Sequence, residues 1–187
     1  MRWPKSLYYQ MGGLGWFTDK RVELIEGEII ETAPMGTAHL NGVGRASRAM
    51  FRAFGDDFLV MCPGALDLGT DTEPEPDIVV ARLAGDGLAS KEPSDAALVI
   101  EVADSSLRYD RTTKAALYAS AEISDYWIVN LNDRTVVVHR SPQGDDENRG
   151  TFNELTTYRE GEWIEPLALP GARIAVSDLL PPTVSKS

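Results

Sequence analysis

The sequence predicts a single α/β (α+β) domain in which a mixed β-sheet is flanked by helices. Two strongly apolar runs, 77–81 and 97–103, have the length and composition of strands buried inside such a sheet. Apolar side chains at helical spacing predict one helix before them, over about 37–54, and the chain is expected to form a second helix after them, over about 110–121. Strands and helices in this order favour a layered architecture.

Turn residues and apolar runs place the remaining elements. Glu26-Gly27 reads as a tight turn between two short strands. The further strands are expected at 22–25, 28–31, 58–61, 65–68, 126–130 and 135–139. A polar loop over 141–150, short β segments within 152–174 and a brief helix near 177–180 complete the chain.

The composition is that of an ordinary globular protein. The length of 187 residues fits one domain over 1–187, with a core at about 20–140 and a β-rich C-terminal extension at about 150–180. The chain has one cysteine, Cys62, no apolar run near the length of a membrane span, and no apolar signal segment at its start. We therefore expect a cytoplasmic protein without a membrane partner.

The net charge of −11 counts against a protein that coats nucleic acid, because such binding depends on neutralising phosphates with Lys and Arg. An enzyme that contacts DNA through a local basic patch is still compatible with this charge. Arg45, Arg48 and Arg52 fall on one side of the predicted helix and are the best candidates for DNA binding. The alternative is that they form an ordinary solvated helix face.

Glu101 is the most informative residue, because it interrupts an apolar strand. Both faces of the 97–103 run are otherwise apolar, so we expect a central strand covered on both sides, with Glu101 beside Val99 and Ala103. A buried carboxylate is costly unless it is paired. Glu101 therefore needs a cation, strong hydrogen bonds or a proton, and a structural ion pair with an arginine is the alternative.

Asp77 opens the other strong strand, directly after Pro76. Alone, it would be a common aspartate at a strand start. On a strand next to Glu101, however, it would complete a pair of hard oxygen ligands of the kind that Mg²⁺ prefers. Mg²⁺ or Mn²⁺ at this pair would lower the pKa of a bound water and offset charge on a phosphoryl group.

Lys114 lies on the predicted helix that follows the Glu101 strand. It shares a stripe with Leu117 and Tyr118, and this stripe is expected to face the sheet. A lysine there could orient an attacking water or stabilise charge on a phosphate. The alternative is a surface lysine paired with Asp110 one turn earlier.

These residues resemble the Uma family of "putative restriction endonucleases", which belongs to the PD-(D/E)XK nuclease superfamily. The resemblance covers about 22–140 and depends on the order and spacing of several motifs. They are Glu23-Leu-Ile-Glu-Gly-Glu-Ile-Ile30, His39, Pro76-Asp77, Ile100-Glu101-Val102-x-x-Ser105, Asp110-x-x-x-Lys114, Tyr118 and Tyr126-Trp127-Ile128-Val129. The resemblance implies a restriction-endonuclease-like fold and a bound Mg²⁺ or similar ion.

One position departs from the pattern of the superfamily. There the lysine lies two residues after the glutamate, where this chain has Ala103. The resemblance moves this role to Lys114 on the following helix. It also makes Glu26 an accessory candidate, and His39 could contact phosphate or assist proton transfer. The alternatives for these two are a turn residue and a partly buried histidine at a helix start.

Two functions follow from these observations. The first is a metal-dependent endonuclease in which Asp77 and Glu101 bind the metal, Lys114 assists, and DNA phosphodiester bonds are hydrolysed. Cleavage of both strands would favour a homodimer. The second is a catalytically inactive nuclease-fold scaffold or binding protein, which the acidic charge and Ala103 favour. The distance between the Lys114 ammonium and the two carboxylates discriminates between them.

Overall fold

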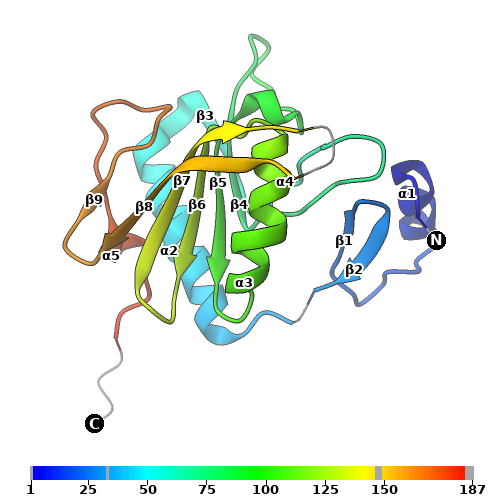
Figure 1. Cartoon of the computed structure of the whole chain (residues 1–187), viewed down its shortest axis with the longest axis horizontal. Helices are drawn as coiled ribbons and strands as arrows, with labels where there is room; N and C mark the ends of the chain where they lie inside the picture. The colour runs from blue at the N-terminus through cyan, green and yellow to red at the C-terminus, as the bar shows by residue number, and fades with distance from the viewer. Residues whose placement is uncertain (1, 33, 146–148, 184–187) are drawn as a thin grey trace.

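The computed structural model describes residues 2–32, 34–145 and 149–183, and its largest element is a six-stranded sheet (Figure 1). The strands are β3 (Phe58–Met61), β4 (Ile78–Arg82), β5 (Ala96–Ala103), β6 (Asp125–Asn130), β7 (Thr135–Gln143) and β8 (Thr151–Arg159), and they lie in this order. β5 and β6 are parallel, whereas all other neighbours are antiparallel. The predicted mixed sheet is confirmed, with β5 at its centre.

Helices cover both faces of the sheet (Figure 1). α2 (Thr37–Phe54) packs on one face, where its apolar side chains join Ile100 and its neighbours in a buried cluster. The other face carries a continuous helical segment made of α3 (Leu107–Tyr109), a π-helical turn (Asp110–Lys114) and α4 (Ala115–Ser120). The helix predicted over 110–121 therefore begins three residues earlier and contains an irregular turn.

A small N-terminal unit lies at one side of the sheet (Figure 1). It consists of α1 (Lys5–Gly13) and a hairpin of β1 (Val22–Ile25) and β2 (Glu28–Glu31). The hairpin pairs with the segment before β4, since the Glu73 N–H donates to the Leu24 carbonyl at 2.6 Å. β1 is thus attached to the chain that leads into the central sheet.

The C-terminal part adds a strand to the main sheet and a small cap. β9 (Trp163–Ile164) and β10 (Ile174–Ala175) form a two-stranded sheet, and α5 (Val176–Leu179) follows directly. α5 contributes buried side chains to the same apolar cluster as α2. Within the described ranges, no helix combines the length and the apolar character needed to cross a membrane.

The predicted strand at 65–68 is wrong. Leu66 and Leu68 do donate backbone hydrogen bonds, to the carbonyls of Pro74 and Thr72 at 3.1 Å each. Proline has no N–H, however, so Pro74 cannot return a bond and no reciprocal ladder forms there. The segment is an extended, hydrogen-bonded coil rather than a strand.

The chain after 140 contains more regular structure than predicted. β7 continues to Gln143, and β8 is a nine-residue strand in place of short β segments. The two strands pair from Thr135 opposite Arg159 to Gln143 opposite Thr151. Most β8 side chains are exposed, so their polarity resembles that of a loop. Residues 146–148 of the predicted loop lie outside the described residues.

Gly42 allows α2 to approach the central strand closely. A Cβ atom at this position would lie 2.8 Å from Val102 Cγ1 and 3.0 Å from Leu131 Cδ2. Both distances are shorter than an ordinary van der Waals contact, and Val102 is completely buried. Gly44, two residues later, has no atom within 4 Å of the corresponding point.

The two glycines predict opposite effects of the same substitution. We expect Gly44→Ala to raise the free energy of unfolding by about 0.5–1 kcal/mol, because alanine favours the helix. Gly42→Ala should lower it by about 1–3 kcal/mol, because the added methyl group overpacks the contact with β5. Urea denaturation of both variants tests this, and a stabilised Gly42→Ala variant would contradict the close packing.

Candidate active site

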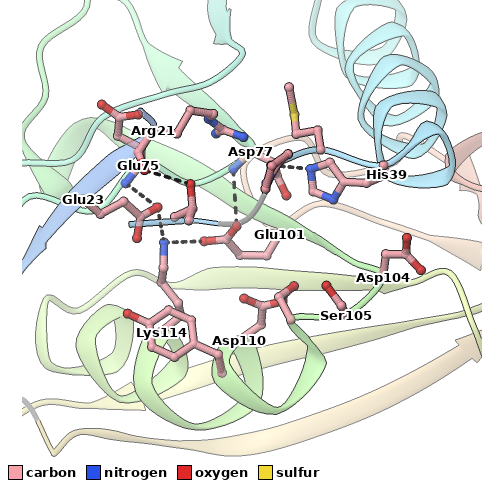
Figure 2. Close-up of a pocket in the computed structure, with 16 residues that line it drawn as sticks. Arg21, Glu23, His39, Glu75, Asp77, Glu101, Asp104, Ser105, Asp110 and Lys114 are labelled. Carbon is pink, nitrogen blue, oxygen red and sulfur yellow. Dashed lines mark hydrogen bonds and ion pairs between the residues drawn. The ribbon is translucent and has the colours of Figure 1, made fainter. Parts of the chain in front are cut away.

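A pocket of about 140 Å³ opens where the β1–β2 hairpin, the start of α2, the β4–β5 pair and α3 meet (Figure 2). Its lining is strongly charged. The charged and titratable side chains that approach one another there include Glu23, His39, Asp77, Glu101, Asp110 and Lys114. They come from five separate parts of the chain, so only the folded protein brings them together.

The β4–β5 register brings Asp77 next to Glu101. Ile78 pairs with Ile100, and the next position of this antiparallel register places Asp77 opposite Glu101. The Asp77 N–H donates to Glu101 Oε2 at 3.4 Å, and the Val102 N–H donates to Asp77 Oδ2 at 2.8 Å. Both residues are buried: the exposed fraction is 8% for Asp77 and 6% for Glu101. The predicted proximity of the two residues is therefore present.

Lys114 points into this pocket rather than to solvent (Figure 2). Its Nζ lies 3.2 Å from Glu101 Oε1 and 2.9 Å from Glu23 Oε1, and the residue is 3% exposed. The surface pair with Asp110 is not formed, since Asp110 instead accepts a hydrogen bond from Ser106 Oγ at 2.6 Å. The π-helical turn, which contains both Asp110 and Lys114, leaves both of them buried. Such turns often occur at functional sites.

The pocket contains more carboxylates than cations. Burial raises the pKa of Glu101 to about 8; Lys114 opposes this shift, and the Asp77 and Asp110 carboxylates add to it. Burial also raises the pKa of Asp110 to about 6. For Lys114, burial acts to lower the pKa, but Glu101 and Glu23 outweigh it and the net shift is upward. The lysine is thus a stable cation among carboxylates that it does not fully neutralise.

Tyr118 and His39 each hold one carboxylate of the pair by a hydrogen bond. The Tyr118 hydroxyl donates to Glu101 Oε1 at 2.7 Å from a completely buried position on α4. His39 Nε2 lies 3.0 Å from Asp77 Oδ1, and this hydrogen bond raises the pKa of His39. His39 belongs to the first turn of α2, as predicted, and contacts the Asp77 carboxylate.

The structure does not bring the accessory candidate Glu26 into the pocket lining. Glu26 occupies the turn between β1 and β2 with a φ of 49°, and it is not among the residues that line the pocket. Glu23, three residues earlier on β1, lines the pocket instead. A signal for Glu23 was present in the sequence, because Val22-Glu23-Leu24-Ile25 is an apolar run interrupted by one carboxylate, the pattern that singled out Glu101.

The arginine stripe lies elsewhere on the molecule. Arg45, Arg48 and Arg52 line a different depression of about 350 Å³ on the outer side of α2, together with Asp178. Arg45 Nη2 donates to the Ser177 carbonyl at 3.1 Å. None of the three arginines lines the pocket that contains Asp77 and Glu101.

The oxygen ligands of the pocket are of the kind that a hard divalent cation binds. Asp77 and Glu101 offer carboxylate oxygens from adjacent positions, and Glu23 Oε2 is buried without a hydrogen-bond partner in the described part of the chain. Mg²⁺ needs one or two carboxylates and completes its shell with water and phosphate oxygens. No three His, Cys, Asp or Glu side chains of the described residues converge into a preformed metal cluster. The two adjacent carboxylates of Asp77 and Glu101 fit a Mg²⁺ or Mn²⁺ site whose remaining ligands are water and phosphate oxygens.

Known proteins resemble this chain in family and in fold. A family model named Uma2 and described as "Putative restriction endonuclease" matches residues 8–177. The chain is also similar to the crystal structure of a "putative nuclease belonging to DUF820" from Anabaena variabilis ATCC 29413. The TM-score is 0.62, with 16% sequence identity over 87% of this chain and 90% of that chain. At this identity the likeness shows the fold alone. No curated protein matches the chain.

The buried position of Lys114 predicts a large stability effect. Lys114→Met should lower the free energy of unfolding by about 3–5 kcal/mol, because it leaves Glu23 and Glu101 buried without their cation. Lys20→Met is the matched control, since Lys20 pairs with Glu31 on the surface at 2.7 Å, and exposed pairs contribute less than about 1 kcal/mol. Chemical denaturation at neutral pH compares the two, and equal effects would argue against a buried ammonium.

Proposed function

Because the chain belongs to the Uma2 family, whose model spans most of its length, we propose that it is a metal-dependent endonuclease that hydrolyses DNA phosphodiester bonds. The observation that carries the proposal is the meeting of Asp77, Glu101 and Lys114 at one pocket, with the ammonium 3.2 Å from the Glu101 carboxylate. Two carboxylates and a lysine supply the metal ligands and the cation that such hydrolysis requires.

Asp77 and Glu101 are the residues that would hold Mg²⁺ or Mn²⁺. Such an ion supplies Lewis acidity, which makes a water molecule a stronger nucleophile and offsets charge on the phosphate. Hydrogen bonds from the chain hold the Asp77 and Glu101 carboxylates in fixed orientations. Tyr118 holds Glu101 at 2.7 Å, and Val102 and His39 hold the two oxygens of Asp77 at 2.8 and 3.0 Å.

Lys114 supplies a fixed positive charge beside Glu101. Its ammonium has three protons to donate; Glu23 accepts one at 2.9 Å, and Glu101 forms an ion pair with the ammonium at 3.2 Å. A remaining proton can be donated to a phosphate oxygen or to the attacking water. The lysine would thereby place one of these groups and stabilise negative charge that develops on the phosphate.

The strongest argument for an inactive scaffold was the absence of a lysine on the strand. Ala103 is completely buried and belongs to the apolar cluster beneath α4, so a lysine there would displace the core. Lys114 reaches the carboxylate pair from the helix on that same face. This arrangement supports the proposed nuclease, and metal titration together with a cleavage assay separates the two functions.

DNA contacts beyond the pocket are proposed for Arg45, Arg48 and Arg52. They gather positive charge on the outer side of α2 in a protein with a net charge of −11. Phosphate contacts of this kind position a duplex without reading its sequence. We further propose a homodimer, in which two pockets would cut the two strands of one duplex.

Glu101→Gln tests the central proposal. The substitution keeps the shape of the side chain but removes the charge that would hold the cation. We expect Mn²⁺ binding, measured by calorimetry, to be lost, together with the nicking of supercoiled plasmid in the presence of Mg²⁺ or Mn²⁺.

The same plasmid assay tests the homodimer. If the unchanged protein cuts both strands in one binding event and releases linear plasmid, the result supports cleavage by a dimer.

Glu28→Gln is the matched control, because Glu28 is an exposed glutamate on β2. It should bind Mn²⁺ and cut DNA like the unchanged protein. Metal binding without cleavage in the unchanged protein would favour the scaffold function. Absence of metal binding would refute the metal-dependent site and leave Glu101 in a structural ion pair with Lys114.

Replacing Arg45, Arg48 and Arg52 with Ala tests the proposed DNA surface. If the three residues contact phosphates, the plot of log affinity against log salt should become less steep by about 2–3, since each phosphate contact contributes about 0.9 to the slope. A variant with Arg82, Arg111 and Arg173 changed to Ala is matched in charge, and all three residues are exposed. Equal changes in the two variants would show a general charge effect in place of a binding surface.

A further inference from the structure

Glu23 is a buried carboxylate that reaches the pocket from outside the central sheet. It lies on β1, in the hairpin beside the sheet, and only 5% of the residue is exposed. Figure 2 shows the Glu23 and Glu101 carboxylates both facing the Lys114 ammonium, from different directions. Lys114 is therefore held between two carboxylates, of which only Glu101 is assigned to the metal.

The two carboxylates bind Lys114 unequally. Glu23 Oε1 lies 2.9 Å from Nζ in a hydrogen bond, and the Glu75 N–H donates to the same oxygen at 3.2 Å. Glu101 Oε1 is farther from Nζ, at 3.2 Å. Glu101 has two other donors, the Tyr118 hydroxyl and the Asp77 N–H, so its orientation does not depend on Lys114.

We propose that Glu23 is a positioning residue that keeps Lys114 in place while Glu101 binds a divalent cation. The inference rests on the proposed function, because it concerns the use of the same pocket. A cation at Glu101 repels the nearby ammonium, and this repulsion is strong at short range in a poorly solvated pocket. Glu23 offers the ammonium a second anion, at 2.9 Å, so that Lys114 need not leave the pocket or compete for Glu101.

The attachment of the hairpin explains how Glu23 can do this. β1 is joined to the segment before β4 by the hydrogen bond between Glu73 and Leu24, and Glu75 in that segment binds Glu23 directly. The same segment ends at Asp77, the start of the metal pair. The hairpin therefore fixes Glu23 relative to Asp77 and Glu101, although it is not part of their sheet.

A double-mutant cycle on the full chain tests the proposal. Mn²⁺ affinity is measured by calorimetry for the unchanged protein, Glu23→Gln, Lys114→Met and the double variant. In the presence of Lys114, Glu23→Gln should weaken Mn²⁺ binding about tenfold or more, as is typical for partners in the outer shell of a metal site. In the Lys114→Met background the same substitution should change the affinity less than about twofold, because no ammonium then competes for Glu101.

The alternatives give different cycles. If Glu23 is itself a ligand of the cation, or acts only through its charge, Glu23→Gln weakens binding equally in both backgrounds, and the proposal is overturned. If Glu23 has only a structural role, the affinity is unchanged in either background, which overturns it as well. Glu28→Gln provides the control for a neutralised carboxylate on the neighbouring strand.

The same four proteins give a readout without metal. The losses in melting temperature should be non-additive, so that Glu23→Gln costs clearly less in the Lys114→Met background than in the unchanged protein. Additive losses would overturn the link between Glu23 and Lys114, whatever the metal does. If the unchanged protein binds no Mn²⁺, the proposed function fails. The melting temperatures still decide whether Glu23 holds Lys114. Should the double variant not fold, an Mn²⁺ affinity of folded Glu23→Gln equal to that of Glu28→Gln overturns the proposal.

Discussion

The burial of Glu101 in the central strand is the constraint on which the pocket depends. A carboxylate covered by a sheet on one side and a helix on the other cannot rely on water, so the protein has to compensate it. Tyr118 and Lys114 do this from the helix, and Asp77 does it through its backbone from the neighbouring strand. Each of these contacts fixes one element against β5, so the requirement of a single side chain determines how three elements are arranged.

The negative charge around Glu101 is only partly compensated by the chain. Asp77, Asp110 and Glu23 all add negative charge near Glu101, whereas Lys114 is the one lysine that lines the pocket among the described residues. A protein selected for stability alone would gain from replacing such a cluster by apolar residues. The retention of a negative pocket in the core of the fold is what would be expected of a site that receives its remaining positive charge from outside the chain.

The main sheet and the carboxylate pair were predictable because both follow from local patterns. Glu101 interrupts an apolar run, and Asp77 begins the other strong strand, so their meeting required only that the two runs be neighbours. Glu23 was missed although it interrupts an apolar run as Glu101 does, because a run of four residues in a hairpin does not show that both of its faces are buried. The strand expected at 65–68 failed because its partner segment contains proline. Patterns along the chain reveal burial by regular sheets but not burial by irregular neighbours.

The π-helical turn that contains Asp110 and Lys114 has a further consequence for how such a site could change. A π-turn is an α-helix with one extra residue per turn, so it is equivalent to a single-residue insertion that the helix has absorbed. Because the turn has absorbed this residue, removing it would make the backbone regular and leave the helix on either side in nearly the same orientation. The change would fall on the side chains inside the turn, Asp110 and Lys114, whose directions depend on its irregular geometry. The spacing of this helix, more than its composition, separates a chain that retains the pocket from one that retains only the architecture.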